Sequence, residues 1–261
     1  MYKLKFHRGR LASIFVSVLL LISSSASALA QTNPARTPSE TVREFYKGLF
    51  EKRFREALGI SIYKPAIEGL TQQEFDELRP DFEAMALGAD KIEITGEQIS
   101  GEKATVFVRV PDDNGDMQTS KVDLIRSGGA WIVGSAEDEK AVKSAGKEFF
   151  YEVRIQAHHE EVKVMMERII KAQVVHSSQH NGLFADIPTL VKAGLLPQDI
   201  GTTASTGYRF HLTLGSDKKT YGVGAEPAQY GRTGKLSYYL DQTGTLQRKD
   251  MGGKPLLPEK K

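Results

Sequence analysis

Two pairs of histidines in the second half of the chain have spacings that could support metal chemistry. His176 and His180 are four residues apart in a stretch with helical periodicity, so both imidazoles lie on one face of a helix. No acidic residue follows at a spacing that would add a ligand, and a solvated helix end would show the same pattern. His159-Glu160 resembles the start of a zinc-protease motif, but Lys163 stands where that motif requires its second histidine. The metal candidates in this region are therefore His176 and His180 alone.

Two acidic loops contain the oxygen donors that calcium prefers. Residues 112–116 (DDNGD) form one such cluster, and Asp241 lies in a second turn, Asp241-Gln242-Thr243-Gly244. Neither loop has the length or the bidentate glutamate of an EF-hand, and Asn-Gly and Asp-x-Thr-Gly are also ordinary solvated turns. We therefore predict no cofactor, with calcium at Asp241 as the alternative.

Residues 37–135 show no acid–base pair, such as a histidine with an aspartate, at a spacing that would indicate catalysis. This interval contains no histidine, and no Ser-His-Asp or phosphate-cradling pattern occurs in the chain. Tyr46, Tyr63 and Arg109 are candidates to line a ligand pocket, although aromatic core residues and surface charge would look the same. We predict no catalytic residues and no enzymatic activity.

The first half of the chain reads as helices followed by strands. Apolar residues recur at helical spacing from Val42 to Leu58, after Ser39 as a possible cap. A second helix begins at Thr71-x-x-Glu74, which fits a capping box, and Pro80 is expected to interrupt it. From residue 92 the period changes to two, with Asn114-Gly115 and Gly128-Gly129 as hairpin turns.

The second half reads as one long helix followed by short strands. Residues 136–147 are charged and are expected to be a linker, possibly helical, before a helix from Phe149 to Gln179 that ends at Asn181-Gly182. A short helix follows from Ile187 to Ala193. We predict that an apolar stripe on the long helix is covered by the strands that contain Tyr208 and Tyr238. The stripe consists of Val162, Met165, Met166, Ile169, Ala172 and Gln173.

Residues 37–135 resemble the NTF2-like (cystatin-like α+β cone) superfamily. The resemblance rests on the helix SETVREFYKGLFEKRFREAL, the strand EKATVFVRV and the closing hairpin KVDLIRSGGAWIV. It implies a curved antiparallel sheet that wraps around helices and leaves a pocket. Some members of the superfamily are enzymes, and many are binding or dimerisation modules.

Residues 148–252 are similar to the globular part of type IV pilin-like and type II secretion pseudopilin-like proteins. The segments that carry this resemblance are GLFADIPTLVKAGLL, GYRFHLTL and YGVGAEPAQYGRTGKLSYYLDQTGTL. The resemblance implies a long helix packed on a small antiparallel sheet, and in some pseudopilins a calcium site in the C-terminal loops. The chain departs from true pilins because it has no pilin leader and no apolar N-terminal half-helix with a glutamate near its start. The fold class is therefore expected to be α+β in two domains, 37–135 and 148–252, with a disordered tail at 253–261.

The N-terminus has the pattern of an export signal. Basic residues between Lys3 and Arg10 precede the apolar run Leu11 to Ile22, and Ala28-Leu29-Ala30 gives a cleavage site. We predict a signal peptide over residues 1–30 and a linker at 31–36, with an uncleaved anchor as the alternative. No segment after the signal is expected to span a membrane.

The composition excludes several classes of function. The chain has 261 residues and no cysteine, so lipobox anchoring, disulfides and thiol chemistry are excluded. Four of the 35 basic residues and none of the 33 acidic ones lie within the first thirty, so the remainder is nearly neutral. Such a charge balance does not indicate a nucleic-acid-binding protein.

Two hypotheses for function follow. The first is an exported, periplasmic or secreted, non-enzymatic binding or assembly protein of the cell envelope. Its partner would be a protein, such as a pilus or type II-like secretion component, or another copy of itself. The second is an enzyme or small-ligand carrier that uses the pocket of residues 37–135.

Overall fold

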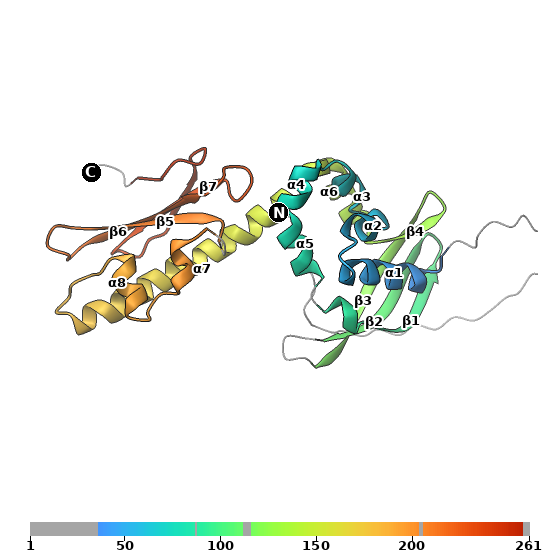
Figure 1. Cartoon of the computed structure of the whole chain (residues 1–261), viewed down its shortest axis with the longest axis horizontal. Coiled ribbons are helices and arrows are strands. Elements are labelled where there is room, and N and C mark those ends of the chain that lie inside the picture. Colours follow the sequence, from blue (N-terminus) through green and yellow to red (C-terminus); the bar gives the residue numbers. More distant parts are fainter. Residues whose placement is uncertain (1–35, 87, 112–115, 204–205, 258–261) are drawn as a thin grey trace, which may run out of the picture. The chain divides into compact units, whose positions relative to one another are not determined.

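The protein is mixed α+β and divides into two compact units, Met1–Phe149 (unit 1) and Phe150–Lys261 (unit 2). The structure, a computed structural model, describes residues 36–257 except 87, 112–115 and 204–205 (Figure 1). The predicted signal peptide, most of the predicted linker at 31–36 and the Asn114-Gly115 turn lie outside the described residues. Among the described helices, none combines the length and apolar character that crossing a bilayer would require.

Unit 1 begins with short helices that have clear start signals in the sequence. Thr37 caps the first helix in a capping box with Glu40, two residues before the predicted Ser39. The predicted box of Thr71 with Glu74 is present. The helix that starts after Thr71 is interrupted at Leu78, two residues before Pro80, and is therefore divided in two, as expected. The helices are α1 (Pro38–Phe50), α2 (Phe54–Gly59), α3 (Lys64–Glu68), α4 (Gln72–Glu77), α5 (Arg79–Met85) and the 3₁₀ turn η1 (Ala89–Lys91).

The first helix is shorter than the continuous helix that the periodicity predicts through Leu58. It ends at Phe50, and Lys52 adopts a left-handed conformation with φ 58°. The reversal brings Ala57 against Gly48, where an added Cβ would lie 2.9 Å from the Ala57 Cβ. Two short helices can therefore pack on each other and both bury apolar faces, whereas one straight helix would expose one of them.

The sheet of unit 1 is an antiparallel meander in the order β1-β2-β3-β4. Val106 and Val108 on β2 are buried, and α1 contacts β1, β2 and β4 on this sheet (Figure 1). The last hairpin turns at Gly128 and Gly129, whose φ values of 58° and 82° suit glycine. The strands are β1 (Glu93–Ser100), β2 (Lys103–Pro111), β3 (Met117–Ser127) and β4 (Ala130–Val133).

Residues 136–147, predicted to be a linker, are an ordered part of unit 1. They form α6 (Ala136–Ala145) and the start of the 3₁₀ turn η2 (Gly146–Glu148), and both contact α3. Ser135 caps α6 by accepting a hydrogen bond from the backbone N–H of Asp138, and Val142 on this helix is fully buried. One buried valine fixes this helix, which is too little apolar content to show a periodic stripe in the sequence.

Unit 2 is built on α7 (Phe149–Gln179), which packs on an antiparallel sheet in the order β5-β6-β7-β8 (Figure 1). The predicted stripe on α7 is buried in one core with Tyr208 and Tyr238, which confirms its predicted cover. The helix is followed by Asn181 and Gly182 in left-handed conformations, as predicted. The other elements are α8 (Ile187–Lys192), the 3₁₀ turn η3 (Gln198–Gly201), β5 (Tyr208–Leu214), β6 (Tyr221–Pro227), β7 (Leu236–Asp241) and β8 (Gln247–Asp250).

The tail predicted to be disordered from 253 is held at its start. The hydroxyl of Ser237 donates a 2.7 Å hydrogen bond to the carbonyl of Lys254. Gly253 lies against Tyr230, with 2.9 Å between an added Cβ and the Tyr230 Cβ. The tail therefore remains ordered at least through Lys254, because it supplies a hydrogen-bond partner to Ser237, a fully buried side chain.

Candidate functional site

A cleft in unit 1 is created by a long-range backbone pairing at the edge of β4. The amide of Ile62 donates to the carbonyl of Val133 (2.9 Å), and the amide of Val133 donates to the carbonyl of Ile60 (3.0 Å). The segment between α2 and α3 is thereby held beside the closing hairpin, more than sixty residues later in the chain. This pairing brings Gly59–Ser61 and Ala130–Ile132 to the same cleft.

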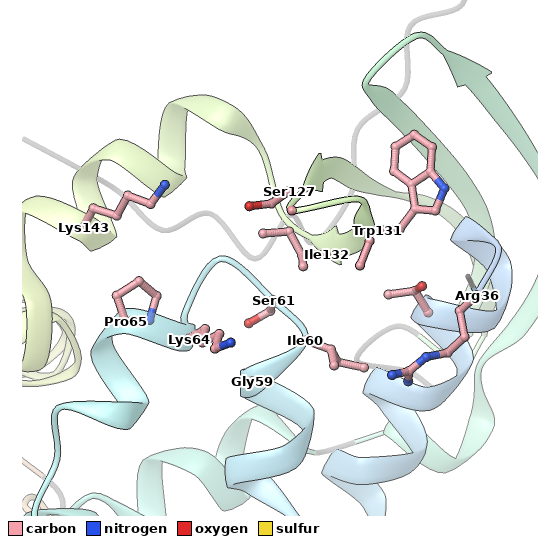
Figure 2. A pocket seen from close by; sticks show the side chains of 13 residues that line it. Arg36, Gly59, Ile60, Ser61, Lys64, Pro65, Ser127, Trp131, Ile132 and Lys143 are labelled. Carbon is pink, nitrogen blue, oxygen red and sulfur yellow. The ribbon is translucent and has the colours of Figure 1, made fainter. Parts of the chain in front are cut away.

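The cleft has a volume of about 860 Å³, and its described lining has a cationic character. Arg36, Lys64 and Lys143 line it, together with the ring of Trp131. Figure 2 shows Lys64 and Lys143 on one side and Arg36 and Trp131 on the other. The remaining lining residues are Thr41, Gly59, Ile60, Ser61, Pro65, Ser127, Gly128, Ala130 and Ile132, so the described lining contains no carboxylate and no histidine.

The two lysines make ion pairs within their own helices. The Lys64 Nζ lies 3.8 Å from a Glu68 carboxylate oxygen, and the Lys143 Nζ lies 2.8 Å from one of Glu139. Both lysine side chains are more than half exposed. Glu68 is exposed as well, and a solvent-exposed i,i+4 pair of this kind contributes about 0.3–0.5 kcal/mol, whereas the side chain of Glu139 is only 18% exposed. The exposed ammonium groups of both lysines therefore remain accessible to an anion that enters the cleft.

The buried hydroxyl groups of Ser61 and Thr41 in the cleft lining form hydrogen bonds with backbone groups. Ser61 donates to the carbonyl of Leu58 (2.7 Å) and accepts from the amide of Tyr63 (3.1 Å). Thr41 donates to the carbonyl of Thr37 (3.0 Å). Neither hydroxyl has a histidine or a carboxylate among the described lining residues that could activate it as a nucleophile.

The residues predicted to line a pocket do not line this cleft. Tyr46 and Tyr63 are close enough to interact electrostatically, and burial raises the pKa of both phenols. The Tyr63 ring packs on Phe149 at 5.5 Å between centroids. Arg109 is exposed, next to the buried Val108 on β2, and pairs with Glu93 at 3.2 Å. The two tyrosines are thus structural neighbours, and Arg109 is a surface residue.

The predicted metal ligands fall in two places in unit 2. His176 and His180 are stacked in parallel, with 3.9 Å between ring centroids. Asp241 uses its carboxylate in its own turn, where it accepts hydrogen bonds from the Thr243 amide (2.9 Å) and hydroxyl (2.7 Å). In the described ranges, no group of three or more potential ligands is gathered for a metal ion. Residues 112–115 of the other acidic loop lie outside those ranges.

A buried acid in unit 2 was not foreseen from the sequence. Glu226 on β6 is almost fully buried, and the imidazole Nε2 of His211 on β5 lies 2.5 Å from its carboxylate. Arg209, the residue paired with Glu226 across the two strands, places its Nε 3.6 Å from the same oxygen. The alternation of Arg209 and His211 on one face was visible in the sequence, but their shared partner depends on the register between β5 and β6.

Comparisons with known proteins give little beyond this geometry. No protein-family model matches the chain, and no curated protein matches it. Among solved structures, a putative NTF2-like transpeptidase from Campylobacter jejuni is similar, with 18% sequence identity and a TM-score of 0.27. The match covers 38% of this chain and 97% of that one. A likeness at this identity and TM-score carries no argument about fold or function.

Proposed function

We propose that the protein is an exported, non-enzymatic binding protein of the cell envelope, and that unit 1 holds an acidic group of its partner in the cleft. The observation that carries this proposal is that Arg36, Lys64 and Lys143 line one cleft together with Trp131, and that the described lining contains no acid. Guanidinium and ammonium groups bind carboxylates through charge-assisted hydrogen bonds, and an indole ring offers apolar contact area beside them. Export itself rests on the pattern of residues 1–30.

The partner is proposed to be a protein of the envelope or a second copy of this chain. A pilus or type II-like secretion component is a candidate because residues 148–252 resemble pilin-like globular parts. Unit 2 contains a long helix, α7, packed on a four-stranded antiparallel sheet, which is the arrangement that this part of the proposal requires. A small-ligand carrier is the second candidate, since Trp131, Ile132 and Pro65 give the cleft apolar surface for a molecule that bears one acidic group.

Trp131 allows the proposal to be tested directly, because it is the single tryptophan of the chain. We would titrate the full mature protein with a short Asp/Glu-rich peptide and follow tryptophan fluorescence. A matched peptide with Asn and Gln in place of the acids provides the ligand control. The expected result is a saturable change with the acidic peptide only, which weakens as salt screens the charges.

Charge reversal in the cleft provides the matched variants. Lys64→Glu combined with Lys143→Glu should abolish the response, whereas Lys171→Glu, on an exposed position of α7, should leave it intact. The same three proteins would then be used to retain partners from an envelope extract. A response that is equal for both peptides, or unchanged in the double variant, would overturn the proposal. A small acidic amphiphile that binds where the peptide does not would favour the carrier.

A further inference from the structure

The paired histidines at the end of α7 are fixed in the same tautomer by backbone carbonyls. The Nδ1 of His176 lies 3.1 Å from the carbonyl oxygen of Leu183, and the Nδ1 of His180 lies 2.8 Å from that of His176. A carbonyl oxygen only accepts hydrogen bonds, so Nδ1 must carry the proton in both rings. In the neutral form, both Nε2 atoms therefore present a lone pair.

The two rings are also held beside each other. Their centroids are 3.9 Å apart and their planes differ by 2°, because His180 is one turn beyond His176 on the same helix face. Neither Nε2 makes a hydrogen bond within the described ranges of the chain. Leu183 follows the left-handed Asn181 and Gly182, so the turn that ends α7 supplies the carbonyl that orients His176.

Two histidines whose Nδ1 atoms donate to carbonyls and whose Nε2 atoms make no hydrogen bond in the described part of the chain resemble the histidine ligands of a metal site. Ligating histidines usually donate their other ring N–H to a carbonyl or carboxylate, which fixes the tautomer before the metal arrives. Imidazole nitrogen suits Zn²⁺, Cu²⁺ and Ni²⁺, whereas Mg²⁺ and Ca²⁺ prefer oxygen donors. An ion bound by both rings would lie about 2.0–2.1 Å from each Nε2 atom.

The geometry points to a two-histidine site for a divalent transition-metal ion at the C-terminal end of α7, with the Nε2 atoms of His176 and His180 as ligands. Two protein donors leave the other coordination positions to water or to a donor from another molecule. The site lies in unit 2 and does not depend on the cleft of unit 1. Its test therefore stands or fails independently of the proposed binding function.

The test is a calorimetric titration of the full mature chain, purified without a histidine tag, with Cu²⁺ and Zn²⁺. We expect one ion per chain, tighter binding of Cu²⁺ than of Zn²⁺ according to the Irving–Williams order, and no binding of Mg²⁺. Thermal unfolding of unit 2 should shift upwards with metal, because an ion that binds only the folded state stabilises it.

Two substitutions separate a chelating pair from a lone histidine. His180→Gln removes one donor at an exposed position, and we expect at least a tenfold loss of affinity, since even outer-shell partners contribute that much. His158→Gln is the matched control. The Nδ1 of His158 is also bonded to a carbonyl, that of Thr233 at 2.8 Å, but no imidazole lies one turn away on its face.

The inference is supported if His180→Gln weakens binding and removes the thermal shift while His158→Gln retains both. Equal affinity in the wild type and His180→Gln would overturn it, as would the absence of any one-to-one binding by the wild type. His180→Ala repeats the measurement without an amide that could itself contact the ion.

Discussion

The side-chain amide of Gln173 forms two hydrogen bonds with the backbone of Ala185. Its Nε2 donates to the Ala185 carbonyl at 2.6 Å, and its Oε1 accepts from the Ala185 amide at 3.0 Å. Gln173 is completely buried on the apolar stripe of α7. These two bonds pair the N–H and C=O groups of Ala185, which would otherwise be buried without a hydrogen-bond partner. They also hold the segment before α8 against the long helix.

Gln173→Leu should lower the free energy of unfolding of unit 2 by about 2–4 kcal/mol, because it leaves two buried backbone groups without partners. Urea unfolding followed by circular dichroism measures the effect. Gln156→Leu makes the same exchange at an exposed position of α7 and should change stability by less than about 0.5 kcal/mol. Similar effects of the two substitutions would show that the bonds to Ala185 contribute little.

Ile169→Asp should unfold unit 2 and leave the melting of unit 1 unchanged. Ile169 is fully buried in the core that includes Tyr208 and Tyr238, and a charge placed there costs more than about 4 kcal/mol. Differential scanning calorimetry of the full chain should lose one transition and keep the other. Val174→Asp, on the same helix at 61% exposure, should retain both. Loss of both transitions in Ile169→Asp would mean that the two units do not unfold separately.

The stability of unit 2 should fall as the pH drops below about 6.5. Burial, together with the charge of Lys163, lowers the pKa of His159 from 6.5 to about 4. Between these values the unfolded chain binds the proton and the folded chain does not. The free energy of unfolding of unit 2 is therefore unaffected by His159 above pH 6.5 and decreases progressively as the pH falls towards 4. The expected decrease between pH 7 and pH 5 is about 1–2 kcal/mol.

His159→Gln isolates this effect from other titrations. The Nε2 of His159 accepts hydrogen bonds from the amides of Lys235 (3.3 Å) and Leu236 (3.4 Å), and a glutamine oxygen can accept in its place. The variant should show a smaller change in stability between pH 7 and pH 5 than the wild type. Unit 1 provides an internal control, because residues 37–135 contain no histidine. An unchanged pH dependence in the variant would contradict the prediction.

Glu74→Gln should destabilise unit 1 by about 1–2 kcal/mol at pH 7. The Glu74 carboxylate accepts from the Thr71 amide at 3.0 Å and from Lys147 Nζ at 3.0 Å, and these bonds lower its pKa to about 2. Its contribution is present above pH 4.5 and is lost as the pH falls towards 2, so the variant should be less sensitive to acid. Glu102→Gln, at an exposed turn, is the control. An equal effect of both substitutions on urea unfolding would contradict a role for Glu74.

Most elements of the fold could be predicted from local patterns. The stripe of α7, the alternation in β2 and the capping box at Thr71 each involve residues within a few positions of one another. Apolar periodicity does not predict an element that buries few apolar residues, such as α6 with its single buried valine. It also does not reveal a break between two helices whose apolar patterns are continuous in sequence, as between α1 and α2 at Lys52.

The candidate sites depended on contacts between distant parts of the chain. Arg36, Lys64 and Lys143 share a cleft because Ile60–Ile62 pairs with the edge of β4, and no local pattern encodes that pairing. The spacing of His176 and His180 gave their common face. Their tautomer and parallel stacking required the turn that returns the Leu183 carbonyl to the helix. Local periodicity therefore determined which faces are buried, whereas the path of the chain decided which polar groups converge.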